Sequence, residues 1–112
     1  MPPEDLVRLR HMIEALESVQ RMIAGRQRKD LDSDEMLRLA LTRAIEVVGE
    51  AAGRVSEVTR SVTRHIPWHQ LSGMRNRLIH AYFDVNRDIV WTTATRDGPM
   101  LLAQVRELVE GK

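Results

Sequence analysis

Residues 35–58 read EMLRLALTRAIEVVGEAAGRVSEV, and this stretch decides the fold. Its apolar and small residues recur at alternating spacings of four and three, at Leu37, Leu41, Ala44, Val48, Ala51, Val55 and Val58. This spacing predicts one long helix, capped at Asp32 or Ser33, with Glu35 completing a capping box. The small residues along it predict that another helix approaches closely, at Ala44, Gly49, Ala51, Ala52 and Gly53.

A second apolar stripe precedes this helix, at Leu6, Leu9, Ile13, Leu16 and Ile23. It predicts a helix over residues 5–24 that ends at Gly25. The polar residues 26–30 follow as a loop. A connection this short favours an antiparallel pair of helices.

The second half of the chain has weaker periodicity. Ile66-Pro67 interrupts the helical pattern, and we expect a third helix to begin at Pro67, with Gly73 dividing it. Asp84 or Asn86 is expected to end that helix and cap a fourth one around residues 89–91, where three nearby threonines favour strand. A last helix is expected after Asp97-Gly98-Pro99, with its stripe over residues 101–109.

Composition agrees with this pattern. The 112 residues predict one domain spanning 1–112, an all-α antiparallel bundle of four to five helices. The chain has no cysteine and no apolar leader or membrane span, so we expect a cytoplasmic protein. Its net charge of +1 argues against coating nucleic acid through bulk electrostatics, so any RNA contact must be local.

One segment, residues 74–84 with the sequence MRNRLIHAYFD, gathers residues suited to chemistry. Arg75 and His80 fit the spacing Arg-x-x-x-x-His, but Arg60 with His65 and Arg64 with His69 fit it equally. The spacing alone therefore does not distinguish Arg75 and His80 from the other two pairs. The segment is set apart by Asn76 beside the arginine and Tyr82 two residues after the histidine.

With these residues the chain resembles the HepT-like branch of the HEPN superfamily. The pattern Arg-Asn-x-x-x-His-x-Tyr of that branch matches Arg75, Asn76, His80 and Tyr82 without a gap. Its Pro-Trp and Gly-Met elements are similar to residues 67–68 and 73–74, and its Ile-Glu-x-x-Gly-Glu-Ala pattern resembles residues 45–51. The resemblance covers the chain from about Asp5 to the last helix.

The resemblance implies a toxin of a prokaryotic toxin-antitoxin system that cleaves RNA endonucleolytically, with neither metal nor cofactor. It implies a homodimer whose two motifs meet at a shared cleft, with Arg75, Asn76 and His80 catalytic. It also implies a minimal nucleotidyltransferase antitoxin as partner, in a complex that extends to a larger hetero-oligomer, which silences the toxin by attaching AMP to Tyr82.

The residue types suit this chemistry on their own terms. Histidine titrates near pH ~6.5, so His80 can accept or donate a proton during attack by a ribose 2′-hydroxyl. Arg75 can stabilise charge that develops on the phosphate. On a continuous helix Asn76 and His80 would share a face, whereas Arg75 and His80 would point roughly 140° apart. That angle favours a site completed by a second copy.

Other interpretations remain open. The chain can instead be a non-catalytic helical subunit that positions substrate for a nucleotidyltransferase, or a bundle in which the motif only packs. Arg75 can form an ion pair with Glu46 or Glu50. We expect a structural or orienting role for these two glutamates rather than a metal site. Trp68 is expected in the core or an interface, and the remaining histidines are expected to be packed or at the surface, at His11, His65 and His69.

Overall fold

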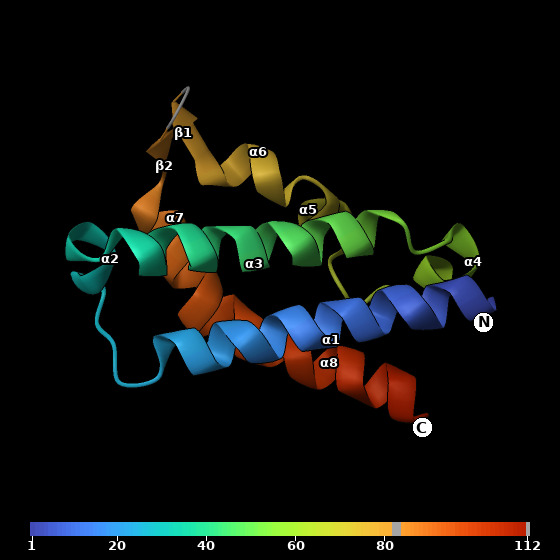
Figure 1. The fold of residues 1–112 in the computed structure, drawn as a ribbon. Coiled ribbons are helices and arrows are strands. Elements are labelled where there is room, and N and C mark those ends of the chain that lie inside the picture. Colours follow the sequence, from blue (N-terminus) through green and yellow to red (C-terminus); the bar gives the residue numbers. More distant parts are fainter. Residues whose placement is uncertain (82–83, 112) are drawn as a thin grey trace.

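The computed structural model describes residues 1–81 and 84–111, with the backbone alone for Arg75, Ile79, His80, Ala81 and Asp84. Two long helices, α1 (Pro3–Ile23) and α3 (Glu35–Gly53), lie side by side and run in opposite directions (Figure 1). The predicted antiparallel pair is therefore confirmed. Gly25 adopts a φ of 73°, a conformation that suits glycine and ends the first helix.

The start of α3 differs from the prediction by one or two residues. A short helix, α2 (Asp30–Ser33), occupies the connection, so Asp32 and Ser33 are helical. The cap is Asp34, whose carboxylate accepts a hydrogen bond from the Leu37 amide at 3.0 Å. The prediction failed because several capping residues stand in a row, and sequence alone does not choose among them.

The predicted long helix also ends early, at Gly53 rather than near Val58, and α4 (Glu57–Ser61) follows as a separate helix. Ser56 is extended at the start of α4, with φ −72° and ψ 161°. The buried carboxylate of Asp5 holds it there by accepting bonds from its amide at 3.0 Å and its hydroxyl at 2.5 Å. The Thr59 hydroxyl donates to the same carboxylate at 2.5 Å.

The helices α5 (Trp68–Ser72) and α6 (Met74–Leu78) pack across α3, divided at Gly73 as predicted. Pro67 lies just before α5 as its cap, not inside its first turn. Gly49 is the point of closest approach. A Cβ atom there would lie 2.8 Å from the Leu71 carbonyl oxygen and 3.2 Å from the Met74 Cβ atom. The expected close packing on small residues of α3 is confirmed.

The chain after α6 is not the continuous helix that the sequence predicted. It turns into two short antiparallel strands, β1 (Ile79–Ala81) and β2 (Asp84–Val85), with Ile79 opposite Val85. The Asn86 amide donates to the Leu78 carbonyl at 2.6 Å and closes the base of this hairpin. Ile79 and Val85, which pair across the two strands, are β-branched residues that favour strand, and here that pairing prevails over helical spacing.

The last third returns to helix. Asn86 caps α7 (Arg87–Thr92) by accepting a bond from the Ile89 amide at 3.1 Å, as one of the two predicted caps. The threonine-rich part is a π-helical turn, Thr93–Asp97, and not a strand. It leads directly into α8 (Gly98–Glu110), which packs on α1. Helices from all parts of the chain contribute fully buried side chains to the core, among them Leu9, Met12, Leu41, Leu78, Val90 and Val105.

The all-α bundle is thus confirmed, with one small hairpin added to it. Among the helices of the described residues, none has both the length and the apolar character that crossing a lipid bilayer requires.

Candidate active site

The motif lies where α6 passes into the hairpin. Arg75 and Asn76 belong to α6, and Asn76 is exposed. His80 belongs to β1, beyond the end of the helix at Leu78. The expected helical geometry is therefore wrong: Asn76 and His80 share no helix face, and the 140° angle between Arg75 and His80 does not apply. Tyr82 lies outside the described residues, as do the side chains of Arg75 and His80.

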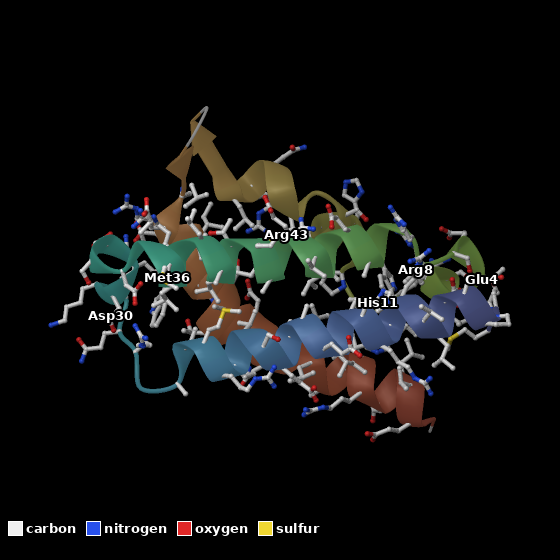
Figure 2. All side chains as sticks on the ribbon, in the orientation of Figure 1. Glu4, Arg8, His11, Asp30, Met36 and Arg43 are labelled. Atoms are coloured by element: carbon white, nitrogen blue, oxygen red, sulfur yellow. The ribbon has the colours of Figure 1, made fainter. Side chains whose placement is uncertain are left out.

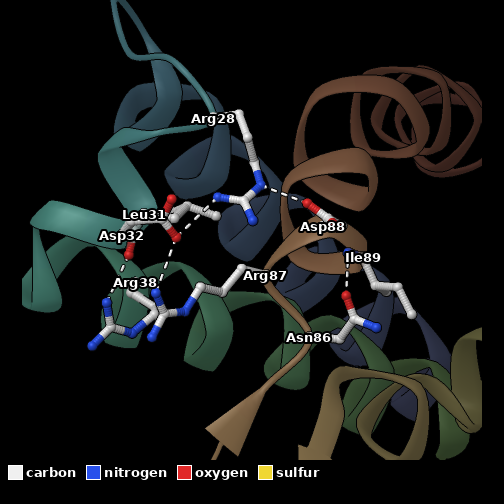
Figure 3. A network of polar contacts seen from close by, with 8 residues as sticks. All are labelled: Arg28, Leu31, Asp32, Arg38, Asn86, Arg87, Asp88 and Ile89. Carbon is white, nitrogen blue, oxygen red and sulfur yellow. Dashed lines mark hydrogen bonds and ion pairs between the residues drawn. The ribbon is translucent and has the colours of Figure 1, made fainter.

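An ionic network holds the hairpin where it enters α7 (Figure 3). Arg87 pairs with Asp32 of α2 at 3.0 Å, and Asp88 accepts a bond from Arg28 at 2.7 Å. Arg28 also contacts Asp32, at 3.2 Å. The start of α7, just after Asn86, is thereby tied to the connection between the two long helices.

The electrostatics of this network stabilise its charged forms. Hydrogen bonds from Arg87, and then from Arg28, lower the pKa of Asp32. The bond to Asp88, and then the one to Asp32, raises the pKa of Arg28. Because the two aspartates are exposed and the two arginines are only partly buried, the pairs contribute little to overall stability, and their main effect is to orient the segment.

The two glutamates expected near the site, Glu46 and Glu50, each form an ion pair with Arg43 of the same helix. Figure 2 shows where Arg43 lies on α3. Arg43 Nη1 lies 3.8 Å from a carboxylate oxygen of Glu46 and 3.5 Å from one of Glu50. The Glu46 side chain is 16% exposed and that of Glu50 is 58% exposed. Each glutamate thus has an arginine neighbour on its own helix.

The structure gives Arg60, the arginine of one competing Arg-x-x-x-x-His pair, contacts of a structural kind. Arg60 donates to the Ala52 carbonyl at 2.8 Å and the Val55 carbonyl at 2.9 Å, and so covers the end of α3. Its guanidinium also lies 5.8 Å from the ring centroid of Trp68. Arg60 therefore has a structural role that leaves it poorly placed for catalysis.

Trp68 lies in the core, as predicted. Its side chain is buried, and its indole N–H donates to the Thr63 hydroxyl at 3.0 Å. A buried indole that has found its hydrogen-bond partner is a packing anchor.

A local basic region escaped the sequence interpretation. Residues 54–80 contain five arginines and three histidines but a single acid, Glu57, although the whole chain has a net charge of only +1. Several of these side chains are exposed, among them Arg54, Arg64, His65, His69 and Arg77. Charge counted in windows along the sequence would have revealed it. Positive charge therefore concentrates on the segment that contains the motif.

Comparison with known proteins matches this chain to one family. The family model described as Ribonuclease HepT-like matches residues 12–108, a range that includes the whole motif. The chain belongs to the HepT-like ribonuclease family. This confirms the resemblance to the HepT-like branch of the HEPN superfamily.

Individual HepT-like relatives are similar over nearly the full chain. A protein of Caldanaerobacter subterraneus subsp. tengcongensis, named as a candidate RNase, is 33% identical over 102 residues, which cover 91% of each chain. The probable ribonuclease HepT of Thermococcus cleftensis is 31% identical over 100 residues, covering 89% of this chain and 91% of its own. A candidate RNase of Methanocaldococcus jannaschii is 29% identical over 116 residues, which cover 100% of this chain and 96% of its own. No solved structure gives a significant match.

Proposed function

We propose that this chain is a metal-independent endoribonuclease, the toxin of a prokaryotic toxin-antitoxin pair, with Arg75, Asn76 and His80 as catalytic residues. One observation carries the proposal: a ribonuclease family matches the chain across the segment that contains these three residues. The concentration of arginine and histidine around that segment supports it, because RNA cleavage requires cations beside a phosphate.

The chemistry assigned to the site is transesterification. His80 accepts the proton of the ribose 2′-hydroxyl as its oxygen attacks the adjacent phosphorus. The bond from phosphorus to the 5′-oxygen breaks, and that oxygen takes up a proton from His80 or from water. Arg75 binds the phosphate oxygens as their charge increases, and Asn76 donates a further hydrogen bond. The products are a 2′,3′-cyclic phosphate and a 5′-hydroxyl.

Two copies of the chain share the proposed site, with Arg75 of one copy acting together with His80 of the other. Because α6 ends at Leu78, no helix angle supports this pairing, and its support is the family resemblance. In the same proposal a minimal nucleotidyltransferase partner transfers AMP from ATP to the Tyr82 hydroxyl in the cytoplasm, and pyrophosphate leaves. A bulky anion two residues from His80 would repel the RNA phosphate and stop cleavage.

The test is cleavage of single-stranded RNA by purified protein in excess EDTA. We expect wild type to cleave and His80→Ala to lose roughly 10²–10⁴-fold in rate, the usual contribution of a general acid or base. His69→Ala is the matched control, because His69 is an exposed histidine on the neighbouring α5. Equal rates for wild type and His80→Ala, with both folded by circular dichroism, would refute the proposal.

A further inference from the structure

A cavity of about 500 Å³ opens beside the motif helix, between α5–α6 on one side and the π-helical turn with α8 on the other. Its floor consists of buried apolar side chains, among them Leu16, Ile45, Val48, Leu71 and Leu101. This volume is typical of sites that hold a small organic group. We call it the α6 pocket.

The rim of the α6 pocket carries polar side chains from several elements, beside the exposed apolar Pro67 and Met100. Arg77 contributes from α6, His65 and Gln70 from the segment before it, and Asp97 and Gln104 from the other side. Arg77 is only two residues after Arg75, a rise of about 3 Å along a helix axis. Residues two apart on a helix also lie roughly 160° apart around its axis, so a group bound at Arg77 would lie across α6 from position 75, about the breadth of one helix away.

The charges on the rim fit an anion with a flat apolar part. Arg77 and His65 lie within the basic region, and a guanidinium can bind phosphate through two parallel hydrogen bonds. Asp97 is the one acid on the rim, and Arg96 lies 3.8 Å away and offsets its charge. The amides of Gln70 and Gln104 both donate and accept hydrogen bonds, as the edge of a nucleobase requires.

We infer that the α6 pocket binds one unstacked nucleobase of single-stranded RNA beside the scissile phosphate. The base lies on the apolar floor, Gln70 and Gln104 hydrogen-bond its edge, and Arg77 binds the neighbouring phosphate. Proteins that recognise single-stranded RNA commonly splay bases out in this way. The α6 pocket then determines which base stands next to the cleavage position. This inference rests on the proposed ribonuclease function for its choice of ligand.

The test measures binding without cleavage. Fluorescein-labelled 12-nucleotide probes of oligo-A, oligo-C, oligo-G and oligo-U, each 2′-O-methylated to prevent attack, are titrated by anisotropy. Arg77→Ala should weaken binding about tenfold, the loss of one charge-assisted phosphate contact. Arg64→Ala removes the same charge from the same basic region but outside the α6 pocket, and should weaken binding less than about threefold.

The base preference tests the pocket more specifically. Wild type should favour one probe over another by about threefold or more, and Gln70→Ala combined with Gln104→Ala should reduce this ratio to about one. Gln27→Ala, in the loop before α2, should leave it unchanged. Equal losses for Arg77→Ala and Arg64→Ala, or an unchanged base preference in the double variant, would overturn the inference. So would pocket variants that change the oligomeric mass by light scattering while RNA affinity stays constant, because the pocket would then be a protein interface.

The two hypotheses fail separately. If wild type does not cleave RNA but Arg77→Ala still weakens binding selectively, the ribonuclease proposal fails and the nucleobase pocket stands. If wild type cleaves and the pocket variants bind as wild type does, the pocket fails alone.

Discussion

The pair of α1 and α3 contrasts with the segment from Met74 to Asn86. The long helices follow the apolar spacing of the sequence closely, and buried leucines fill the space between them. The motif segment breaks its own helical spacing, turning from α6 into a hairpin within five residues. Burial determines the geometry of the first region, whereas the second contains residues suited to chemistry. Variants in the two regions should therefore have opposite effects on stability and cleavage.

The largest expected effect on stability is in the framework. Leu41→Ala removes a fully buried side chain of α3 and should lower the free energy of unfolding by about 2–5 kcal/mol. Leu39→Ala on the same helix is the control, because Leu39 is 59% exposed. Urea denaturation measures both. Cleavage per folded molecule should stay near wild type, and a loss like that of His80→Ala would show that the two regions are not separable.

Gly49→Ala tests how the two regions are joined. The added methyl group would meet the Leu71 carbonyl oxygen at 2.8 Å and push α5–α6 away from α3, at a cost of about 1–3 kcal/mol. Because α6 contains Arg75 and Asn76, cleavage should fall as well. Gly53→Ala is the matched control, since its nearest neighbour would be the Ser72 hydroxyl at 3.9 Å. Full activity in Gly49→Ala would mean that the position of α6 on α3 does not matter for the site.

Asp5→Asn should have the smallest effect, about 1 kcal/mol at neutral pH, the difference between charged and neutral hydrogen bonds. Burial raises the pKa of Asp5, but bonds from the Ser56 and Thr59 hydroxyls and the Ser56 amide outweigh it and leave the pKa below 3.8. The charged form thus stabilises the fold above this pH, and the benefit is lost as pH falls through the folded pKa. The difference in melting temperature between wild type and Asp5→Asn should shrink below pH 3.8. Glu4→Gln, at an exposed site, should show no such trend.

The sequence predicted the long helices more accurately than the motif segment. Spacing located α1, α3 and α8, and single residues located the breaks at Gly25, Gly73 and Asn86. The prediction failed where contacts between residues far apart in the sequence determine the structure. The end of α3 depends on Asp5, which is 51 residues from Ser56, and the Arg28–Asp88 pair joins residues 60 apart. No local pattern predicts such pairs.

For the candidate site, the choice of residues stays a prediction, and the helical geometry predicted for them is wrong. Asn76 and Tyr82 distinguish the motif from the two other Arg-x-x-x-x-His pairs of the sequence. Arg60, from one of those pairs, donates its hydrogen bonds to carbonyls at the end of α3. The expected helix through His80 was wrong because the chain after Leu78 pairs with the segment around Val85, a contact that helical spacing does not reveal. Arg77, to which the pocket inference assigns phosphate binding, was not singled out because it stands outside the motif pattern, although the basic region around it is plain in the sequence.

The measurement that tests the account most directly is complementation between two inactive variants. Arg75→Ala and His80→Ala are purified separately, mixed, briefly unfolded and refolded together, and assayed for RNA cleavage in EDTA. If Arg75 of one copy acts with His80 of the other, each mixed dimer keeps one intact pair, and the mixture should recover about a quarter of wild-type activity if copies pair at random. A mixture as inactive as either variant alone, with mixed dimers demonstrated by mass, would contradict a site shared between two copies.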